Sequence, residues 1–313
     1  MRTVFISQNE FGLICLKELI DVGADVRQVV TKPPKSRISD QESFDTVCNS
    51  HDIPVAESTS VNDPEVIEKI QSCDPELLFV IGWSELVSKR ILAIPSVAAL
   101  GMHPAPLPRG RGRAPLAWSL IKGLDETALT LFHLVEEADA GDIVAQKPMS
   151  ITIEDDAGSM YGKMIKTGRE IIQEFYPQFE DGTAPRKPQN DDEATWWPRR
   201  QPEHGAIDWN QSQQDVYNWI RGQSRPYPGA FSYIDQKKVT VWQADPPDQN
   251  RAFASPGEIM YRDGDALGVG VWEGVVEFTE VQVGDDDPIP AGMLLEQYAL
   301  ESGDEFRNVR FQA

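Results

Sequence analysis

The chain has 313 residues, of which 40% are hydrophobic, so it can form one large domain or two ordinary ones around a sizeable core. Its formal charge of -21, from 50 acidic and 29 basic residues, disfavours general binding of nucleic acids, although such a charge also suits a protein kept soluble in high salt. Because no run of about 18 apolar residues is present, we expect no membrane span.

The first half of the chain alternates short apolar runs with amphipathic stretches. Strands are expected at residues 4–6, 26–31, 77–81, 97–100, 129–134 and 143–147. Helices are expected over residues 11–22, 40–50 and 63–72, the last with Asp63 as N-cap before Pro64. Alternation of this kind predicts an α/β fold with a mostly parallel sheet that helices cover on both faces.

The pattern changes after about Trp197. A polar, loop-like stretch over residues 201–209 precedes a helix expected over 214–223. Short strands, separated by turn residues, are expected at 230–234, 238–243, 266–272 and 275–281. Such a series is typical of a small barrel, so we place a domain boundary near residues 200 to 210.

The segment Gly101 to Trp118 carries the first candidate catalytic group, His103. It is rich in proline and glycine, so we expect neither helix nor sheet there. It also follows an expected strand, and loops at the carboxyl ends of strands hold the sites of open α/β sheets. A lone histidine is nevertheless more often structural than catalytic, so position alone leaves both interpretations open.

A second candidate is Asp139, in the turn Asp139-Ala140-Gly141 between two expected strands. Asp-x-Gly turns are common and often only structural. A carboxylate at this place could instead fix and charge a histidine or take part in proton transfer.

Three cysteines, Cys15, Cys48 and Cys73, lie far apart in the sequence. Their spacing fits neither a metal site nor a disulfide framework, and a sparse, odd set favours a reducing compartment. We therefore expect a cytoplasmic protein without a metal ion.

Taken together, these segments resemble the folate-dependent formyltransferase family, which includes methionyl-tRNA formyltransferases and N-formyltransferases of nucleotide-linked amino sugars. The resemblance spans most of the chain. It rests on His103, Leu107-Pro108, Arg111-Gly112, Ala114-Pro115, Trp118, Asp139-Ala140-Gly141 and Pro226 to Phe231.

The resemblance implies a Rossmann-like catalytic domain over residues 1–200 and an OB-like barrel over 201–313. It implies transfer of a formyl group from 10-formyltetrahydrofolate to an amine, without a metal. His103 would bind the intermediate and relay a proton, and Asp139 would orient His103.

One position departs from the family pattern. The asparagine that donates a hydrogen bond to the developing oxyanion in the family is Gly101 in this chain. Losing such a donor typically costs about 100- to 1000-fold in turnover. Another donor could replace it, the glycine could make room for a differently shaped acceptor, or the protein could be a slow or non-catalytic relative that only binds its ligands.

The resemblance also assigns residues to the two substrates. Trp83 and Leu86 could wall the pterin slot, or they could be core residues. Backbone groups of Glu137, Ala138 and Asp139 would pair with the pterin edge.

The acceptor is left open between two classes. A nucleotide-linked amino sugar is favoured, with Arg109, Arg111 and Arg113 as candidate ligands, although these arginines could equally pair with the many acids. Initiator tRNA is the alternative, but the basic residues Lys32, Lys35 and Arg37 form only a short run that acids soon offset. Strand edges in the barrel leave a homodimer open.

Overall fold

The computed structural model describes residues 1–33, 42–248 and 255–307. These residues form two compact units. The first unit comprises Met1–Pro115, Glu126–Ser150 and Tyr161–Pro198. The second comprises Leu116–Asp125, Ile151–Met160 and the chain from Arg199 onward.

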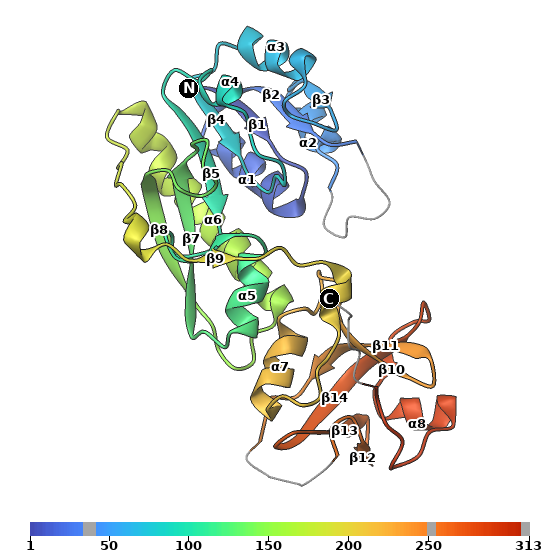
Figure 1. Cartoon of the computed structure of the whole chain (residues 1–313). Coiled ribbons are helices and arrows are strands. Elements are labelled where there is room, and N and C mark those ends of the chain that lie inside the picture. Colours follow the sequence, from blue (N-terminus) through green and yellow to red (C-terminus); the bar gives the residue numbers. More distant parts are fainter. Residues whose placement is uncertain (34–41, 249–254, 308–313) are drawn as a thin grey trace. The chain divides into compact units, whose positions relative to one another are not determined.

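A seven-stranded sheet forms the centre of the first unit, in the order β3-β2-β1-β4-β5-β7-β8 (Figure 1). Neighbouring strands from β3 to β5 are parallel, and β7 and β8 are antiparallel to their neighbours. The mostly parallel α/β sheet predicted from the sequence is therefore confirmed. The strands are β1 (Arg2–Ile6), β2 (Asp25–Thr31), β3 (Val55–Glu57), β4 (Leu77–Val80), β5 (Ala98–His103), β7 (Glu126–His133) and β8 (Ile143–Ser150).

Helices α1 (Glu10–Asp21), α2 (Asp45–Ser50), α3 (Pro64–Ser72), α4 (Lys89–Leu92) and α6 (Ala157–Glu180) accompany this sheet. Apolar residues of α3 and α4 join Val4, Ile6 and Leu78 of the strands in one core cluster. Helix α6 packs on α1, where a Cβ at Gly168 would lie 2.6 Å from the ring of Phe11. The long helix α6 has no counterpart among the elements expected from the sequence.

The predicted helix over 40–50 is shorter in the structure. Helix α2 begins at Asp45, and residues 40 and 41 lie outside the described residues. The hydroxyl of Ser43 accepts the backbone N–H of Asp45 at 3.2 Å. This local contact satisfies a donor at the helix start and so competes with a longer helix.

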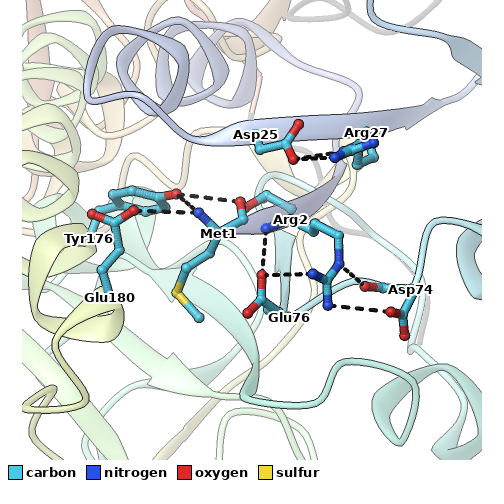
Figure 2. Close-up of polar contacts among 9 residues, drawn as sticks. Met1, Arg2, Asp25, Arg27, Asp74, Glu76, Tyr176 and Glu180 are labelled. Atoms are coloured by element: carbon cyan, nitrogen blue, oxygen red, sulfur yellow. Dashed lines mark hydrogen bonds and ion pairs between the residues drawn. The ribbon is translucent and has the colours of Figure 1, made fainter.

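The amino-terminal ends of the parallel strands are tied together by ion pairs (Figure 2). The Arg2 guanidinium lies 3.3 Å from a carboxylate oxygen of Asp74 and 3.6 Å from one of Glu76. Parallel strands share one direction, so these contacts lie at the opposite edge of the sheet from His103, which ends β5. The carboxyl-terminal edge is thus left for the candidate site.

The prediction that residues 101–118 form neither helix nor sheet is wrong. Strand β5 continues through His103, because β7 pairs with it as far as the His103–Thr130 register. Two residues at 111–112 form β6 (Arg111–Gly112), which pairs with β9 (Trp196–Trp197). Residues from Pro115 begin helix α5 (Pro115–Ile121). Partner strands and the following helix, which local composition does not reveal, decide the structure of this segment.

The second unit is built on α7 (Gln213–Arg221) and an antiparallel sheet in the order β10-β11-β14-β13-β12, with β15 beside β14. This sheet consists of β10 (Ala230–Ile234), β11 (Lys237–Ala244), β12 (Ile259–Asp263), β13 (Ala266–Val271), β14 (Gly274–Val283) and β15 (Ile289–Pro290), and helix α8 (Met293–Tyr298) follows it. Its core includes the fully buried Trp209 and Phe278.

The two edges of this sheet meet on the chain around Phe306. The N–H of Arg307 donates to the carbonyl of Tyr233 in β10 at 2.8 Å, and the N–H of Phe306 donates to the carbonyl of Gly257, just before β12, also at 2.8 Å. These bridges join both edge strands through one segment. The small barrel expected from the sequence is therefore consistent with the structure.

Candidate active site

His103 is the last residue of β5 and is 7% exposed. Its Nε2 lies 2.8 Å from the carbonyl oxygen of Gly110, and its Nδ1 lies 3.7 Å from Oδ1 of Asp139. A carbonyl oxygen only accepts hydrogen bonds, so Nε2 must carry the hydrogen. In the neutral ring, Nδ1 then keeps its lone pair and faces Asp139.

Asp139 lies in the turn between β7 and β8, with a backbone φ of 57°. Few residues other than glycine adopt this left-handed region, although aspartate does so more readily than most. Its Oδ2 accepts the backbone N–H of Gly112 at 2.9 Å. The structure thus brings together the two side chains that the sequence analysis singled out, 36 positions apart.

Gly112 lets the loop approach the turn and the neighbouring strand. Its φ is 107°, and an added Cβ would lie 2.4 Å from the carbonyl oxygen of Trp197 in β9. No side chain fits there. A glycine at this position is therefore required for the N–H that binds Asp139 to sit where it does.

Gly101 lies two residues before His103 on the same strand, with the side chains of Phe132 and Leu134 close to it. A Cβ at this position would lie 2.8 Å from Cδ2 of Leu134 and 3.4 Å from Cε1 of Phe132. A side chain at this position would therefore need Leu134 to shift, while Gly101 itself lines the cavity beside His103.

A cavity of about 220 Å³ opens beside these groups, and all of its lining residues belong to the first unit. Its wall includes Trp83, Leu86, Gly101, His103, Arg113, Leu134, Ala138 and Asp139. The catalytic candidates therefore face the same space as most residues predicted for folate binding.

Trp83 and Leu86 differ in their surroundings. Trp83 packs against the core cluster around Val4 and Ile6 while it also lines the cavity. Its Nε1 is buried and has no acceptor among the described residues. Leu86 is 64% exposed, which is unusual for a leucine and leaves its side chain at the mouth of the cavity.

The backbone expected to pair with the pterin is only partly at the cavity. Ala138 and Asp139 line it, whereas Glu137 is absent from its lining. The Glu137 carboxylate instead lies 3.8 Å from the guanidinium of Arg111.

The three loop arginines lie in different surroundings. Arg109 is exposed and pairs with Glu193 at 3.2 Å. Arg111 is 2% exposed, and its guanidinium contacts Asp191 at 2.6 Å and Gln189 at 2.8 Å. Arg113 is exposed and lines the cavity, and within the described parts of the chain its guanidinium makes no hydrogen bond or ion pair. Of the three, only Arg113 combines an unpaired cation with a place at the cavity.

Two residues at the site, Glu85 and Gln189, were given no role from the sequence alone. Glu85 lines the cavity and accepts hydrogen bonds from Ser60 Oγ at 2.5 Å and from the N–H of Val61 at 3.0 Å. Burial acts to raise the pKa of its carboxyl group, but these hydrogen bonds outweigh burial and lower it. No motif marked either residue, because their partners lie far away in the sequence.

Over the described ranges, no group of three or more histidine, cysteine or acidic residues is placed to hold a metal ion. The basic run beginning at Lys32 can be followed only in part, since Lys35 and Arg37 lie outside the described residues. In the part of the chain that the structure describes, no helix is both long enough and apolar enough to cross a membrane.

Comparison with known proteins gives matches along nearly the whole chain. A family described as "Formyl transferase" matches residues 1–175, and "Formyl transferase, C-terminal domain" matches residues 199–299. A methionyl-tRNA formyltransferase from Citrifermentans bemidjiense is 32% identical over 307 residues, which cover 97% of this chain and 95% of that protein.

Solved structures share the fold at lower identity. HypX from Aquifex aeolicus in complex with tetrahydrofolic acid superimposes with a TM-score of 0.68 at 21% identity, covering 98% of this chain and 50% of HypX. This chain thus spans about half the length of HypX. WlaRD, a sugar 3N-formyl transferase solved in the presence of dTDP and 5-N-formyl-THF, has a TM-score of 0.68 at 13% identity and covers 92% of this chain and 99% of its own.

Proposed function

The chain belongs to the formyl transferase family, and on this premise we propose that it transfers a formyl group from 10-formyltetrahydrofolate to a primary amine. The observation that carries the proposal is the His103–Asp139 pair at the wall of a cavity in the first unit. The donor supplies the formyl group, and the protein's own residues bind, orient and move protons.

The cavity suits a folate donor in two respects. The indole of Trp83 offers an apolar wall together with a buried N–H that has no acceptor among the described residues. A planar heterocycle can stack on this apolar wall. Backbone groups of Ala138 and Asp139 at the same wall can complete the contacts with the edge of the ring.

His103 is proposed to take the proton that the amine loses as it attacks the formyl carbon. Nδ1 holds the lone pair for this step, because Nε2 donates to Gly110. Asp139 lies 3.7 Å from Nδ1 and stabilises the imidazolium that forms. The same nitrogen can return the proton to the departing nitrogen of tetrahydrofolate.

The negative charge that develops on the formyl oxygen needs a hydrogen-bond donor. The family's asparagine side chain would supply it, but this position is Gly101 here, so another group must do so. Gly101 lines the cavity, and Leu134 lies close to the position that a Cβ of this residue would take. We propose that a different donor at the cavity wall serves this purpose, either a backbone N–H or the Arg113 guanidinium.

For the acceptor, a nucleotide-linked amino sugar is proposed. Residues 201–313 contain 19 acidic and 8 basic residues, a balance that opposes binding of a polyanion such as tRNA. A nucleotide sugar needs only a few cations, and the unpaired guanidinium of Arg113 can contact a phosphate at the cavity. Arg109 remains a candidate at the exposed side of the loop, and Arg111 is more deeply committed to its pairing with Asp191.

Initiator methionyl-tRNA is the second candidate, and the 32% identity to a methionyl-tRNA formyltransferase over nearly the whole chain favours it. Adaptation to high salt would also weaken the argument from charge. A cytoplasmic location and a homodimer stay predictions, to be checked by cell fractionation and light scattering.

The test incubates the protein with 10-formyltetrahydrofolate and, separately, with nucleotide-linked amino sugars and charged initiator tRNA. Release of tetrahydrofolate together with a formylated sugar is expected. Formylation of the tRNA alone would overturn the sugar proposal. Binding of the donor without transfer to any acceptor would overturn the proposal that the protein is an enzyme. The protein would then be a folate-binding relative of the family.

A further inference from the structure

Gln189 lies in the segment between α6 and β9, within a stretch that is otherwise mostly exposed. Its Nε2 donates to the carbonyl oxygen of Asp139 at 2.8 Å and to that of Gly141 at 2.7 Å. Its Oε1 accepts from Nε of Arg111 at 3.2 Å and from a terminal nitrogen of the same guanidinium at 2.8 Å. All four hydrogen-bonding positions of this amide are therefore used.

The chemistry of the partners fixes which way the Gln189 amide points. A guanidinium only donates, and a carbonyl oxygen only accepts. The oxygen of the amide must therefore face Arg111 and the nitrogen must face the turn at Asp139. The reversed amide would lose every one of its contacts.

These contacts close a ring around Asp139. Gln189 holds the backbone of Asp139, Arg111 holds Gln189, and the next residue along the chain, Gly112, donates its N–H to the Asp139 carboxylate. Both the backbone and the side chain of Asp139 are thus tied to one loop. The same loop also supplies the Gly110 carbonyl that binds His103.

Arg111, at the far side of this hydrogen-bond network from Asp139, is held firmly in place. The Arg111 guanidinium is 2% exposed and bonds to Asp191 at 2.6 Å. Its backbone N–H donates to Thr195 O at 2.9 Å, beside the β6–β9 pair. The fixed fork of a guanidinium gives the Gln189 oxygen a defined place. Because Arg111 fixes Gln189, Gln189 can in turn hold the turn that contains Asp139. With a φ of 57° at Asp139, this turn needs external contacts to persist.

We propose that Gln189 is a positioning residue that holds Asp139 at its working distance from His103. This inference rests on the proposed function of the His103–Asp139 pair. Gln189 touches neither ring nor carboxylate and acts only through the backbone of the turn. It is not itself a ligand of donor or acceptor, so its loss should lower turnover through displacement of the turn that carries Asp139.

Gln189→Glu is the decisive variant, because it should keep the contact with Arg111 and break the contacts with the turn at Asp139. The new carboxylate keeps and strengthens the pairing with Arg111, whereas its oxygens repel the carbonyl oxygens of Asp139 and Gly141. We expect kcat to fall about 10- to 100-fold, as for other supporting hydrogen bonds around a site. Gln178→Glu is the matched control, since Gln178 also donates to a backbone carbonyl, that of Glu174, but lies in α6, outside the site. It should leave kcat unchanged.

A double-mutant cycle with Asp139→Asn tests whether Gln189 acts through Asp139. Residues that work as a unit give non-additive losses, so Gln189→Glu should have little further effect in the Asp139→Asn background. Additive losses, or a Gln189→Glu enzyme with unchanged kcat, would overturn the proposal.

A second readout does not depend on catalysis. Hydrogen exchange at the amides of residues 137–143 should be faster in Gln189→Glu than in the wild-type protein or the control. If the wild type transfers no formyl group, the proposed function fails, while faster exchange would still support the link between Gln189 and the turn. Unchanged exchange would refute that link itself.

Discussion

The Nε2 of His103 donates a hydrogen bond to the carbonyl oxygen of Gly110 over 2.8 Å. This contact orients the imidazole from the side away from Asp139 and leaves Nδ1 to face the carboxylate. The resemblance to the family implied that Asp139 orients His103. The geometry favours a division of work instead, in which Gly110 fixes the ring and Asp139 supplies negative charge at the reactive nitrogen.

Replacing Asp139 by asparagine should lower kcat by about 100-fold or more, the usual contribution of a positioned acid or base. The amide removes the charge that stabilises the imidazolium and can donate to Nδ1, which occupies the lone pair needed for the reaction. Steady-state kinetics, with donor binding followed by fluorescence, would measure the effect. Unchanged turnover in a variant that binds the donor normally would contradict the role given to Asp139.

Introducing asparagine at Gly101 should not restore a missing activity by itself. The new Cβ would lie 2.8 Å from Leu134, so we expect a loss of about 1–3 kcal/mol in stability from overpacking. Adding Leu134→Ala should recover that stability, since it empties the contested space. If another donor already serves the oxyanion, kcat of the double variant should rise less than about tenfold. A larger rise would mean that the wild-type protein lacks a hydrogen-bond donor for the oxyanion.

Arg113→Ala should raise the KM for an anionic acceptor about tenfold and leave kcat nearly unchanged, since one charge-assisted hydrogen bond is worth about 1.5–3 kcal/mol. The control is Arg27→Ala, an exposed arginine that pairs with Asp25 and is absent from the cavity lining. Initial-rate measurements at varied acceptor concentration separate the two constants. A fall in kcat with unchanged KM would instead place Arg113 at the developing oxyanion.

Glu18 in α1 should stabilise the fold through α6. Its carboxylate is nearly buried and accepts hydrogen bonds from Arg169 at 2.6 Å and Gln173 at 2.5 Å. Burial acts to raise the pKa of Glu18, but these contacts outweigh it and hold the pKa below its ordinary value of 4.5. Glu18→Gln should therefore cost about 1–3 kcal/mol at neutral pH.

The pH dependence of this effect has a definite sign. A lowered carboxyl pKa gives stability above the ordinary value that is lost as the pH falls through the lowered one. The difference in melting temperature between wild type and Glu18→Gln should therefore be largest near neutrality and shrink below about pH 4.5. A difference that stays constant down to the acid transition would contradict the assignment.

The formal charge of -21 predicts that salt affects stability. If the surface is adapted to high salt, the protein should melt at a lower temperature in dilute buffer than in molar potassium chloride, because unscreened acids repel one another. Differential scanning fluorimetry over a salt series would show this. Equal melting temperatures at both ends of the series would remove adaptation to salt as an explanation of the acidic composition.

Local patterns in the sequence were sufficient for the alternation of strands and helices, because periodicity and apolar runs reflect each element's own burial. They also marked His103 and Asp139, through the resemblance of whole segments to a family. They were misleading where pairing partners decide the structure. Strand β5 extends through His103 because β7 lies beside it, and β6 exists because β9 reaches it from 85 positions further on.

The sequence by itself thus determined the fold class, the formyltransferase resemblance and the missing side chain at Gly101. Only the tertiary structure decided which nitrogen of His103 faces Asp139, that Leu134 lies close to Gly101, and that Arg111 and Arg113 have different surroundings. It alone revealed Gln189, whose partners lie 48 to 78 positions away in the sequence. Such facts depend on which groups meet in space, and hydrogen bonds between distant residues leave no periodicity in the chain that makes them.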